Sequence, residues 1–128
     1  MFDRNRSLWS GWVIVSGQHS FYFAGDTALF PGFREILDRF GPIDLAALPI
    51  GAYCPQSIMR RSHLDPEQAI EAAVELQARR TIGIHYGTFD LSDEPLGEPP
   101  KRFRAASSAV GRDEQKDWLF RVGETRSW

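Results

Sequence analysis

The sequence is poor in cysteine, which limits the chemistry that the chain can perform. Cys54 is the single cysteine among 128 residues, so no internal disulfide can form. No Cys-x-x-Cys pair is present to bind zinc or carry out redox chemistry, and no base lies near Cys54 in the sequence to activate its thiol. This cysteine usage favours a reducing compartment, and we expect a cytoplasmic protein.

Long runs of one charge and long apolar runs are also absent. Fifteen Lys and Arg residues oppose 17 Asp and Glu residues, and basic residues gather only in the short pieces RRSH and KRFR. We therefore expect no nucleic-acid partner. No apolar run approaches the roughly 18 residues that span a bilayer, so no transmembrane segment is predicted. Peripheral contact with a membrane stays open.

The length fits one domain that can bury a core without disulfides or a metal. Its start is unusual, because Phe2, Leu8, Trp9 and Trp12 place large apolar groups where a leader is normally polar. We expect this start to correspond to the middle of a domain, and a reading frame truncated at an internal methionine is one explanation.

Alternating patterns in the first half predict strands over 12–16 and 20–24, joined as a hairpin by Gly17, Gln18 and His19. The following segment, 31–41, predicts an amphipathic helix that ends at Gly41. Its apolar residues recur at helical spacing: Phe33, Ile36, Leu37 and Phe40.

The second half predicts a strand over 45–50 that is buried on both faces and ends near Pro49. A helix follows, with Asp65 as its N-cap, Pro66 in its first turn and Arg79-Arg80 in its last turn. We expect its inward stripe to be Ala69, Ile70, Ala73, Val74 and Gln77.

Another strand is predicted over 81–84, and the prolines of 90–100 indicate a loop without regular structure. A helix over 101–111 and a last strand within 117–124 complete the pattern. Because strands and helices alternate, the sequence favours an α/β sheet covered by helices.

Two strands end in polar residues beside glycine, at Gly25-Asp26-Thr27 and at His85-Tyr86-Gly87. A carboxylate and an imidazole at the ends of neighbouring buried strands are typical of a metal or catalytic site. The alternative, that Asp26 caps a turn and His85 is a hydrogen-bonded residue at a strand end, is equally open from spacing alone.

His63 lies two residues before the N-cap Asp65 and could reach the same edge, although a histidine there is more often solvated or capping. We expect no role for His19 in the hairpin turn. The pair Ser107-Ser108 has no triad context.

Four motifs occur in one order: Gly-Asp-Thr, Pro-Ile-Gly-Ala-Tyr, His-x-Asp-Pro-Glu-x-Ala and Ile-His-x-Gly-Thr-Phe. Together they resemble the C-terminal half of metallo-β-lactamase-fold hydrolases, in the branch that includes N-acylphosphatidylethanolamine-hydrolysing phospholipase D and its bacterial relatives. The resemblance covers about 8–100 and more loosely extends to 126. It implies an α/β (α+β) fold in which 1–128 is a partial domain, half of an αββα sandwich, with a mixed sheet and helices on one face.

The resemblance also implies roles for individual residues. Asp26 corresponds to the carboxylate that bridges two zinc ions, and His85 to a terminal ligand of one of them. His63 and Tyr53 are carried over as residues beside the substrate or behind the ligands. The implied reaction is metal-dependent hydrolysis of a phosphodiester such as a phospholipid, although carboxylate and imidazole sites also accept manganese or iron.

The His-x-His-x-Asp-His motif of that family, and a further ligand histidine, are absent from this sequence. A catalytic zinc takes about three protein ligands plus water, and the metal is what activates that water. We therefore expect the chain alone to bind zinc weakly or not at all and to be inactive.

Half of such a sandwich would leave an apolar sheet face uncovered. We expect a homodimer partner or a separate N-terminal half to cover it. A second hypothesis is a non-catalytic module that uses this face for binding or self-association.

Overall fold

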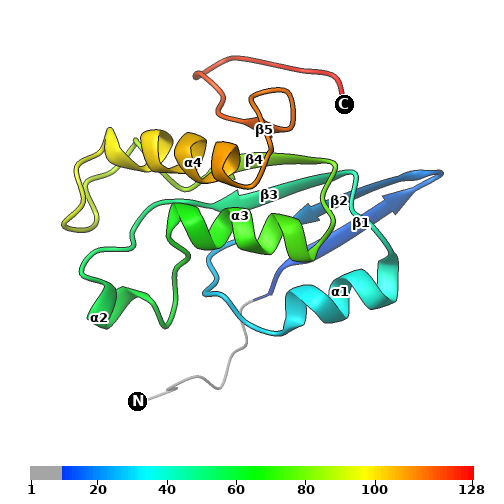
Figure 1. The fold of residues 1–128 in the computed structure, drawn as a ribbon, viewed down its shortest axis with the longest axis horizontal. Helices are drawn as coiled ribbons and strands as arrows, with labels where there is room; N and C mark the ends of the chain where they lie inside the picture. Colours follow the sequence, from blue (N-terminus) through cyan, green and yellow to red (C-terminus); the bar gives the residue numbers. More distant parts are fainter. Residues whose placement is uncertain (1–9) are drawn as a thin grey trace.

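The structure is a computed structural model that describes residues 10–128, so of the apolar residues near the start, Phe2, Leu8 and Trp9 lie outside the described residues and Trp12 lies within them. Five strands form one sheet in the order β1-β2-β3-β4-β5 (Figure 1). The first pair is an antiparallel hairpin, and every later pair is parallel. The strands are β1 (Trp12–Ser16), β2 (His19–Phe23), β3 (Leu45–Pro49), β4 (Arg80–Ile84) and β5 (Asp117–Trp118).

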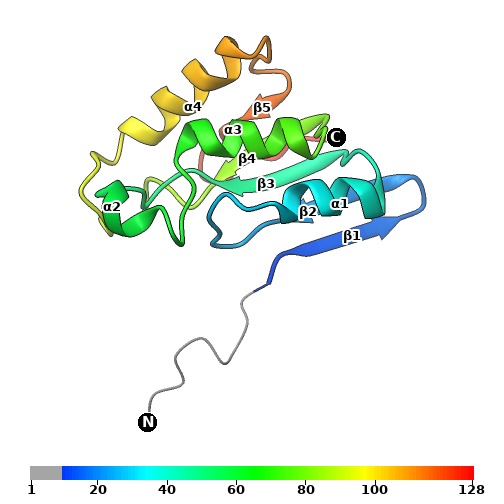
Figure 2. The same ribbon diagram turned by 60° about the horizontal axis from the view of Figure 1, so that its bottom comes forward.

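Three helices connect the parallel strands and cover one face of the sheet, α1 (Gly32–Phe40), α3 (Pro66–Glu75) and α4 (Glu98–Ala109) (Figures 1 and 2). Their side chains share one core with the strands. The mixed sheet with helices on one face confirms the expected fold class. A short helix, α2 (Gln56–Met59), interrupts the loop between β3 and α3 and was not predicted.

The core lies between the sheet and these helices. Ala46 and Leu48 of β3 pack there with side chains from all three helices, including Phe33, Ile70 and Phe103. All five residues of β3 are buried, as expected for a strand covered on both faces. Each fully buried large apolar side chain contributes about 1.5–3 kcal/mol relative to exposure, so β3 anchors the fold.

The opposite face of the sheet is apolar but only partly covered. Trp12 and Ile14 of β1 are 64% and 56% exposed, and Phe23 stands opposite Trp12 in the register. The chain's own end covers part of this face, because Trp128 packs against His19 and Phe21 with ring centroids 5.7 and 6.4 Å apart. A groove of about 540 Å³ remains there. Its lining includes Ile14, Phe21, Leu45, Ile82 and Trp128.

The start of α3 forms as predicted. Asp65 accepts a hydrogen bond from the backbone N–H of Gln68, whose side chain accepts one from the backbone N–H of Asp65. This reciprocal capping, with Pro66 in the first turn, fixes where the helix begins. The predicted end was wrong, because α3 stops at Glu75 and Arg80 already belongs to β4.

The inward stripe of α3 was wrong at two positions. Val74 is half exposed and Gln77 is exposed, whereas Ala72 and Leu76 are buried. Gln77 lies beyond the helix in a left-handed conformation (φ 48°), which turns the chain toward β4. Val74 is one residue after Ala73, about 100° around the helix, and therefore faces solvent.

Two further boundaries differ from the prediction. Helix α4 begins at Glu98 rather than near 101, with Pro99 and Pro100 inside its first turn. Proline is tolerated there because its missing N–H has no partner within the helix. Strand β5 comprises Asp117–Trp118 alone, so most of the predicted strand over 117–124 is loop. Within the described residues, none of the helices has the length and apolar character needed to cross a bilayer.

A buried ion pair joins the end of α4 to the sheet. The guanidinium of Arg112 donates to Asp117 at 2.7–3.0 Å, to the carbonyl of Ala78 at 2.8 Å and to the hydroxyl of Thr81 at 3.3 Å. Ser107 of α4 donates to the same carboxylate at 2.6 Å. The Asp117 side chain is 1% exposed, so either charge would be left buried without its partner if the other were removed.

We therefore predict that Asp117→Ala lowers the free energy of unfolding by about 3–5 kcal/mol, measured by urea denaturation. The control is Asp38→Ala, which breaks the exposed pair with Arg34 on α1 and should change stability by about 0.5 kcal/mol or less. Equal effects of the two substitutions would contradict the structural role given to Asp117.

Candidate metal centre

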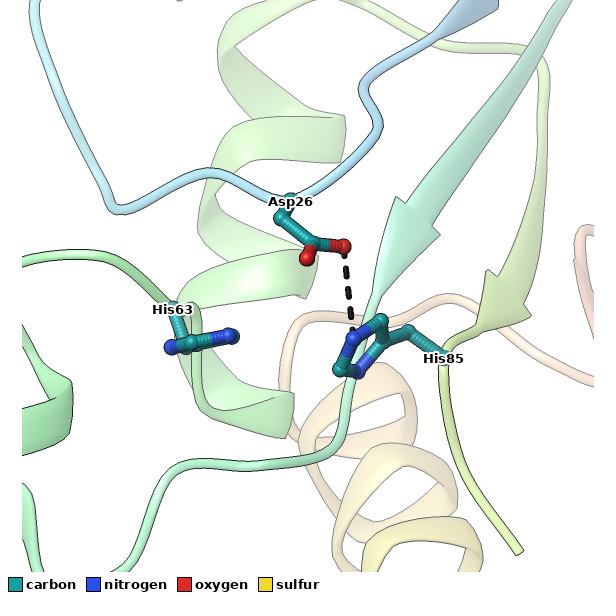
Figure 3. Close-up of side chains that lie close together, drawn as sticks. All are labelled: Asp26, His63 and His85. Carbon is teal, nitrogen blue, oxygen red and sulfur yellow. Dashed lines mark ion pairs between the residues drawn. The ribbon is translucent and has the colours of Figure 1, made fainter. Parts of the chain in front are cut away.

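Three polar side chains meet at the edge where the parallel strands end. Asp26 follows β2, His85 follows β4 directly, and His63 lies in the loop between β3 and α3. The carboxyl ends of neighbouring parallel strands lie along one edge, which is where α/β sheets commonly bind ligands. Figure 3 shows the three side chains directed toward a common space. The predicted meeting of Asp26 and His85 is therefore present, and His63 joins them.

The distances within this cluster suit one metal ion. His85 Nε2 lies 3.3 Å from Asp26 Oδ1, and each residue offers one ligand atom within 4.8 Å of the other two (Figure 3). Zinc binds nitrogen and oxygen at about 2.0–2.2 Å, so two ligands of a tetrahedral ion lie about 3.4 Å apart. Asp26 and His85 already have this separation, and His63 needs only a small shift to join them.

Local backbone geometry places these side chains. His85 itself is left-handed (φ 59°), so the chain turns sharply as β4 ends. The backbone of Gly51 packs directly against the carbonyl of His85, and a Cβ at Gly51 would collide with it. Gly25 is left-handed immediately before Asp26 (φ 64°), which turns the carboxylate out of the line of β2.

The burial of the two metal-facing groups differs. The Asp26 side chain is 62% exposed, whereas that of His85 is 23% exposed. A carboxylate has two oxygens and can contact two cations, whereas neutral imidazole donates one nitrogen to one cation. The exposed position of Asp26 therefore leaves an oxygen accessible from outside the chain.

His63 has the character of a neutral ligand. Burial lowers the pKa of its imidazole, and the nearby His85 lowers it further, against the opposite effects of Asp26 and Glu94. Among the described residues, its Nδ1 is buried without a hydrogen-bond partner. Buried polar atoms normally have a partner, and a neutral imidazole nitrogen can bind a metal. Two imidazoles and a carboxylate are thus a donor set that fits zinc.

Tyr53 lies next to the cluster, on the side of His63. Its side chain is fully buried, and its hydroxyl donates to Glu98 at 2.6 Å. Burial and then the Glu98 hydrogen bond raise the pKa of this phenol well above its usual value, so it stays protonated. Tyr53 and His63 line one polar cavity of about 140 Å³. The role of Tyr53 beside the substrate or behind the ligands stays a prediction.

Two other candidates are placed elsewhere or lack activation. His19 lies on the far face of the sheet against Trp128, so the structure does not bring it to the cluster. Burial raises the pKa of the Cys54 thiol, and the negative charge of Glu94 raises it further. A thiol with a raised pKa is a poor nucleophile at neutral pH.

Sequence reasoning missed one buried carboxylate near the cluster, Glu94. It accepts hydrogen bonds from the backbone N–H groups of Ala52 at 2.6 Å and Cys54 at 2.9 Å, and from the Ser92 hydroxyl at 2.7 Å. Burial raises the pKa of this carboxyl, but the hydrogen bonds outweigh burial and hold the pKa below its usual value. The sequence signal was an acidic residue in a proline-rich loop, which does not reveal which carboxylate is buried.

The loop after His85 forms an apolar wall beside the cluster. Phe89 and Leu91 are 72% and 65% exposed. They line a cavity of about 260 Å³ together with His85, Tyr86 and Thr88. The three side chains of the cluster are therefore bordered by apolar surface on the side of His85 and by the polar cavity on the side of His63.

Comparisons of the sequence with a family model and with known proteins agree on one family. The family model described as a β-lactamase superfamily domain matches residues 1–86. The chain is 40% identical over 120 residues to N-acyl-phosphatidylethanolamine-hydrolyzing phospholipase D 1 of Caenorhabditis elegans, covering 92% of this chain and 33% of that protein. It is 37% identical over 108 residues to a metal-dependent hydrolase of Pyrobaculum aerophilum, covering 84% of this chain and 42% of that protein.

Among solved structures, a metallo hydrolase of Ignicoccus hospitalis superposes with a TM-score of 0.72 at 26% identity. The superposition covers 96% of this chain and 47% of that one. The chain thus spans less than half the length of each of these proteins.

We predict that His63 titrates below the ordinary histidine value of about 6.5, measured from its ring resonances by NMR. Between the lowered folded-state pKa and about 6.5, the unfolded chain binds more protons than the folded chain. Stability is therefore lost as pH falls through this window and is flat above it with respect to this residue. His63→Gln should remove that part of the loss, and a titration midpoint at or above 6.5 would contradict the burial described.

Proposed function

This chain belongs to the metallo-β-lactamase-fold family of metal-dependent hydrolases, and we propose that it supplies Asp26, His63 and His85 to a zinc centre that hydrolyses phosphodiesters. The observation that carries this proposal is the meeting of these three donors at one sheet edge. A metal bound there would lower the pKa of water toward neutrality and stabilise negative charge in the transition state.

Asp26, His63 and His85 differ in exposure, and we assign each a different role at the metal centre. His85, held between β4 and the Gly51 backbone, fixes one ligand position. Asp26 keeps an accessible oxygen with which a second cation could be shared, as the family resemblance implies. His63 directs its imidazole toward the same space, where a ring nitrogen can contact the metal or the substrate (Figure 3).

We propose that polypeptide outside this chain completes the site. The similar proteins are more than twice as long, and three donors leave a binuclear centre short of ligands. The apolar sheet face with Trp12 and Ile14 also needs a cover. A segment with the His-x-His-x-Asp-His motif, packed on that face as the second half of a sandwich, would meet both needs. The chain alone then binds metal weakly and is inactive.

The substrate that we propose is a phosphodiester with an apolar part, such as an N-acylphosphatidylethanolamine. The cavity lined by Phe89 and Leu91 adjoins His85 and is the support within this chain for an acyl-bearing substrate. The same exposed side chains could touch a membrane surface from which such a lipid is taken.

A second candidate function is a non-catalytic module that self-associates. The observation that favours it is the exposure of Trp12, Ile14 and Phe23 on one sheet face. The mass of the metal-free chain in solution separates the two candidates when combined with zinc content. A stable dimer without metal favours the module, and bound metal favours the hydrolase.

We predict that the purified chain binds zinc weakly, through three donors alone, and that Asp26→Asn or His85→Gln weakens this binding further, by at least about tenfold. Even residues behind metal ligands change affinity by about 10–100-fold, so removing a ligand should do no less. Elemental analysis and competition with a chelator measure this, with His19→Gln as the matched control on the far face. Equal affinity of His85→Gln and the unsubstituted chain would remove His85 from the site.

In the completed protein, with the proposed preceding segment, we predict that Asp26→Ala lowers kcat for hydrolysis of bis(p-nitrophenyl) phosphate and of N-acylphosphatidylethanolamine by roughly 10³-fold. This corresponds to several kcal/mol of lost charge stabilisation. Zinc content should fall in the same variant, and Asp38→Asn on the outside of α1 should change neither. Full zinc content in Asp26→Ala would refute its role as a ligand.

A further inference from the structure

We propose that Glu94 is a positioning residue that aligns His85 and His63 by tying together the two loops that carry them. This inference rests on the proposed function, because it takes these histidines to be the metal-facing groups. One loop, 50–65, follows β3 and ends near His63, and the other, 85–97, follows β4 and begins with His85. Glu94 belongs to the second loop and bonds to the first.

The hydrogen bonds of Glu94 reach a segment with a left-handed residue, Ala52. Its Oε1 accepts from the backbone N–H of Ala52 and its Oε2 from that of Cys54, while Asp93 N donates to the carbonyl of Cys54 at 3.2 Å. Ala52 is left-handed (φ 61°), a conformation that costs a residue with a Cβ free energy. The carboxylate satisfies two backbone donors that would otherwise be buried without acceptors.

The segment that Glu94 binds also contacts the backbone of His85. The N–H of Ile50 donates to the carbonyl of Ile84 at 3.0 Å, and the backbone of Gly51 meets the carbonyl of His85. His85 is itself left-handed, a conformation that costs a residue with a Cβ free energy, and Gly51 packs against the carbonyl of this turn. If the hydrogen bonds of Glu94 to Ala52 and Cys54 were lost, Gly51 could move away from the carbonyl of His85. The start of the loop that leads to His63 could then move as well.

The charge of Glu94 is suited to this role. Hydrogen bonds from two backbone N–H groups and one hydroxyl favour the ionised carboxylate, which is a stronger acceptor than a neutral amide. Glutamine at this position has one acceptor oxygen and an NH₂ group that cannot accept from a backbone N–H. Glu94→Gln therefore keeps the size of the side chain and removes one of its two hydrogen bonds to the backbone N–H groups of Ala52 and Cys54.

The experiment uses NMR and zinc titration on the 128-residue chain. The His63 and His85 rings have centroids 5.6 Å apart, so a nuclear Overhauser effect between their ring protons reports the alignment without metal. We expect Glu94→Gln to lose this signal and to raise the zinc dissociation constant about 10–100-fold. If this variant does not fold, Glu94→Asp tests the same role, because its shorter carboxylate cannot span both N–H groups.

Two control variants separate positioning from stability. Glu71→Gln removes an exposed carboxylate on α3 and should change neither measurement. Ile70→Val removes a buried methylene from α3, outside both loops, and should lower the thermal midpoint while keeping the ring-to-ring signal.

The outcomes distinguish this inference from the proposed function. An intact signal with unchanged zinc affinity in Glu94→Gln overturns the inference, as does equal loss of signal in Ile70→Val. If the unsubstituted chain shows the signal but binds no zinc even when the proposed preceding segment is joined to it, the proposed function loses its support, and the ring signal in Glu94→Gln still decides the role of Glu94.

Discussion

The parallel pairing of β2, β3 and β4 is the constraint on which the rest of the structure depends. Parallel neighbours require a crossover, and each crossover here is a helix that returns across the same face of the sheet. The three chain exits therefore fall at one edge, where they deliver Asp26, His63 and His85. A strand pairing of the opposite direction at β3 or β4 would send these residues to opposite ends of the sheet.

Much of this arrangement could be predicted from the sequence because its signals are local. The alternation of β1 and β2, the continuous apolar run of β3 and the Asp65-Pro66 cap each determine structure within a few residues. The end of α3 was missed because the left-handed turn at Gln77, which has no sequence signature of its own, precedes the basic pair. The start of α4 was missed because the two prolines were taken as breakers, although the first helical turn accepts them.

The candidate site divides in the same way. Asp26 and His85 could be predicted because each lies just after a strand, within two residues of a glycine. The sequence left open whether His63 reaches the cluster, because its place depends on the path of a long loop that includes the unpredicted α2. The role of Glu94 could not be predicted for a similar reason, since the backbone N–H groups that it binds are 40 and 42 residues away. Local patterns can therefore locate the ligands at strand ends, whereas the loops that align them depend on tertiary contacts.

The core of this chain lies almost entirely on the helix-covered side of the sheet, and the far side carries Trp12, Ile14 and Phe23 in partial contact with water. Burial of that second face can stabilise the protein only when another polypeptide covers it. If the covering chain is a separate molecule, this stabilisation follows mass action, and the melting temperature of the assembled protein will rise with the concentration of that chain. If the covering chain is covalently joined, the melting temperature will be independent of concentration.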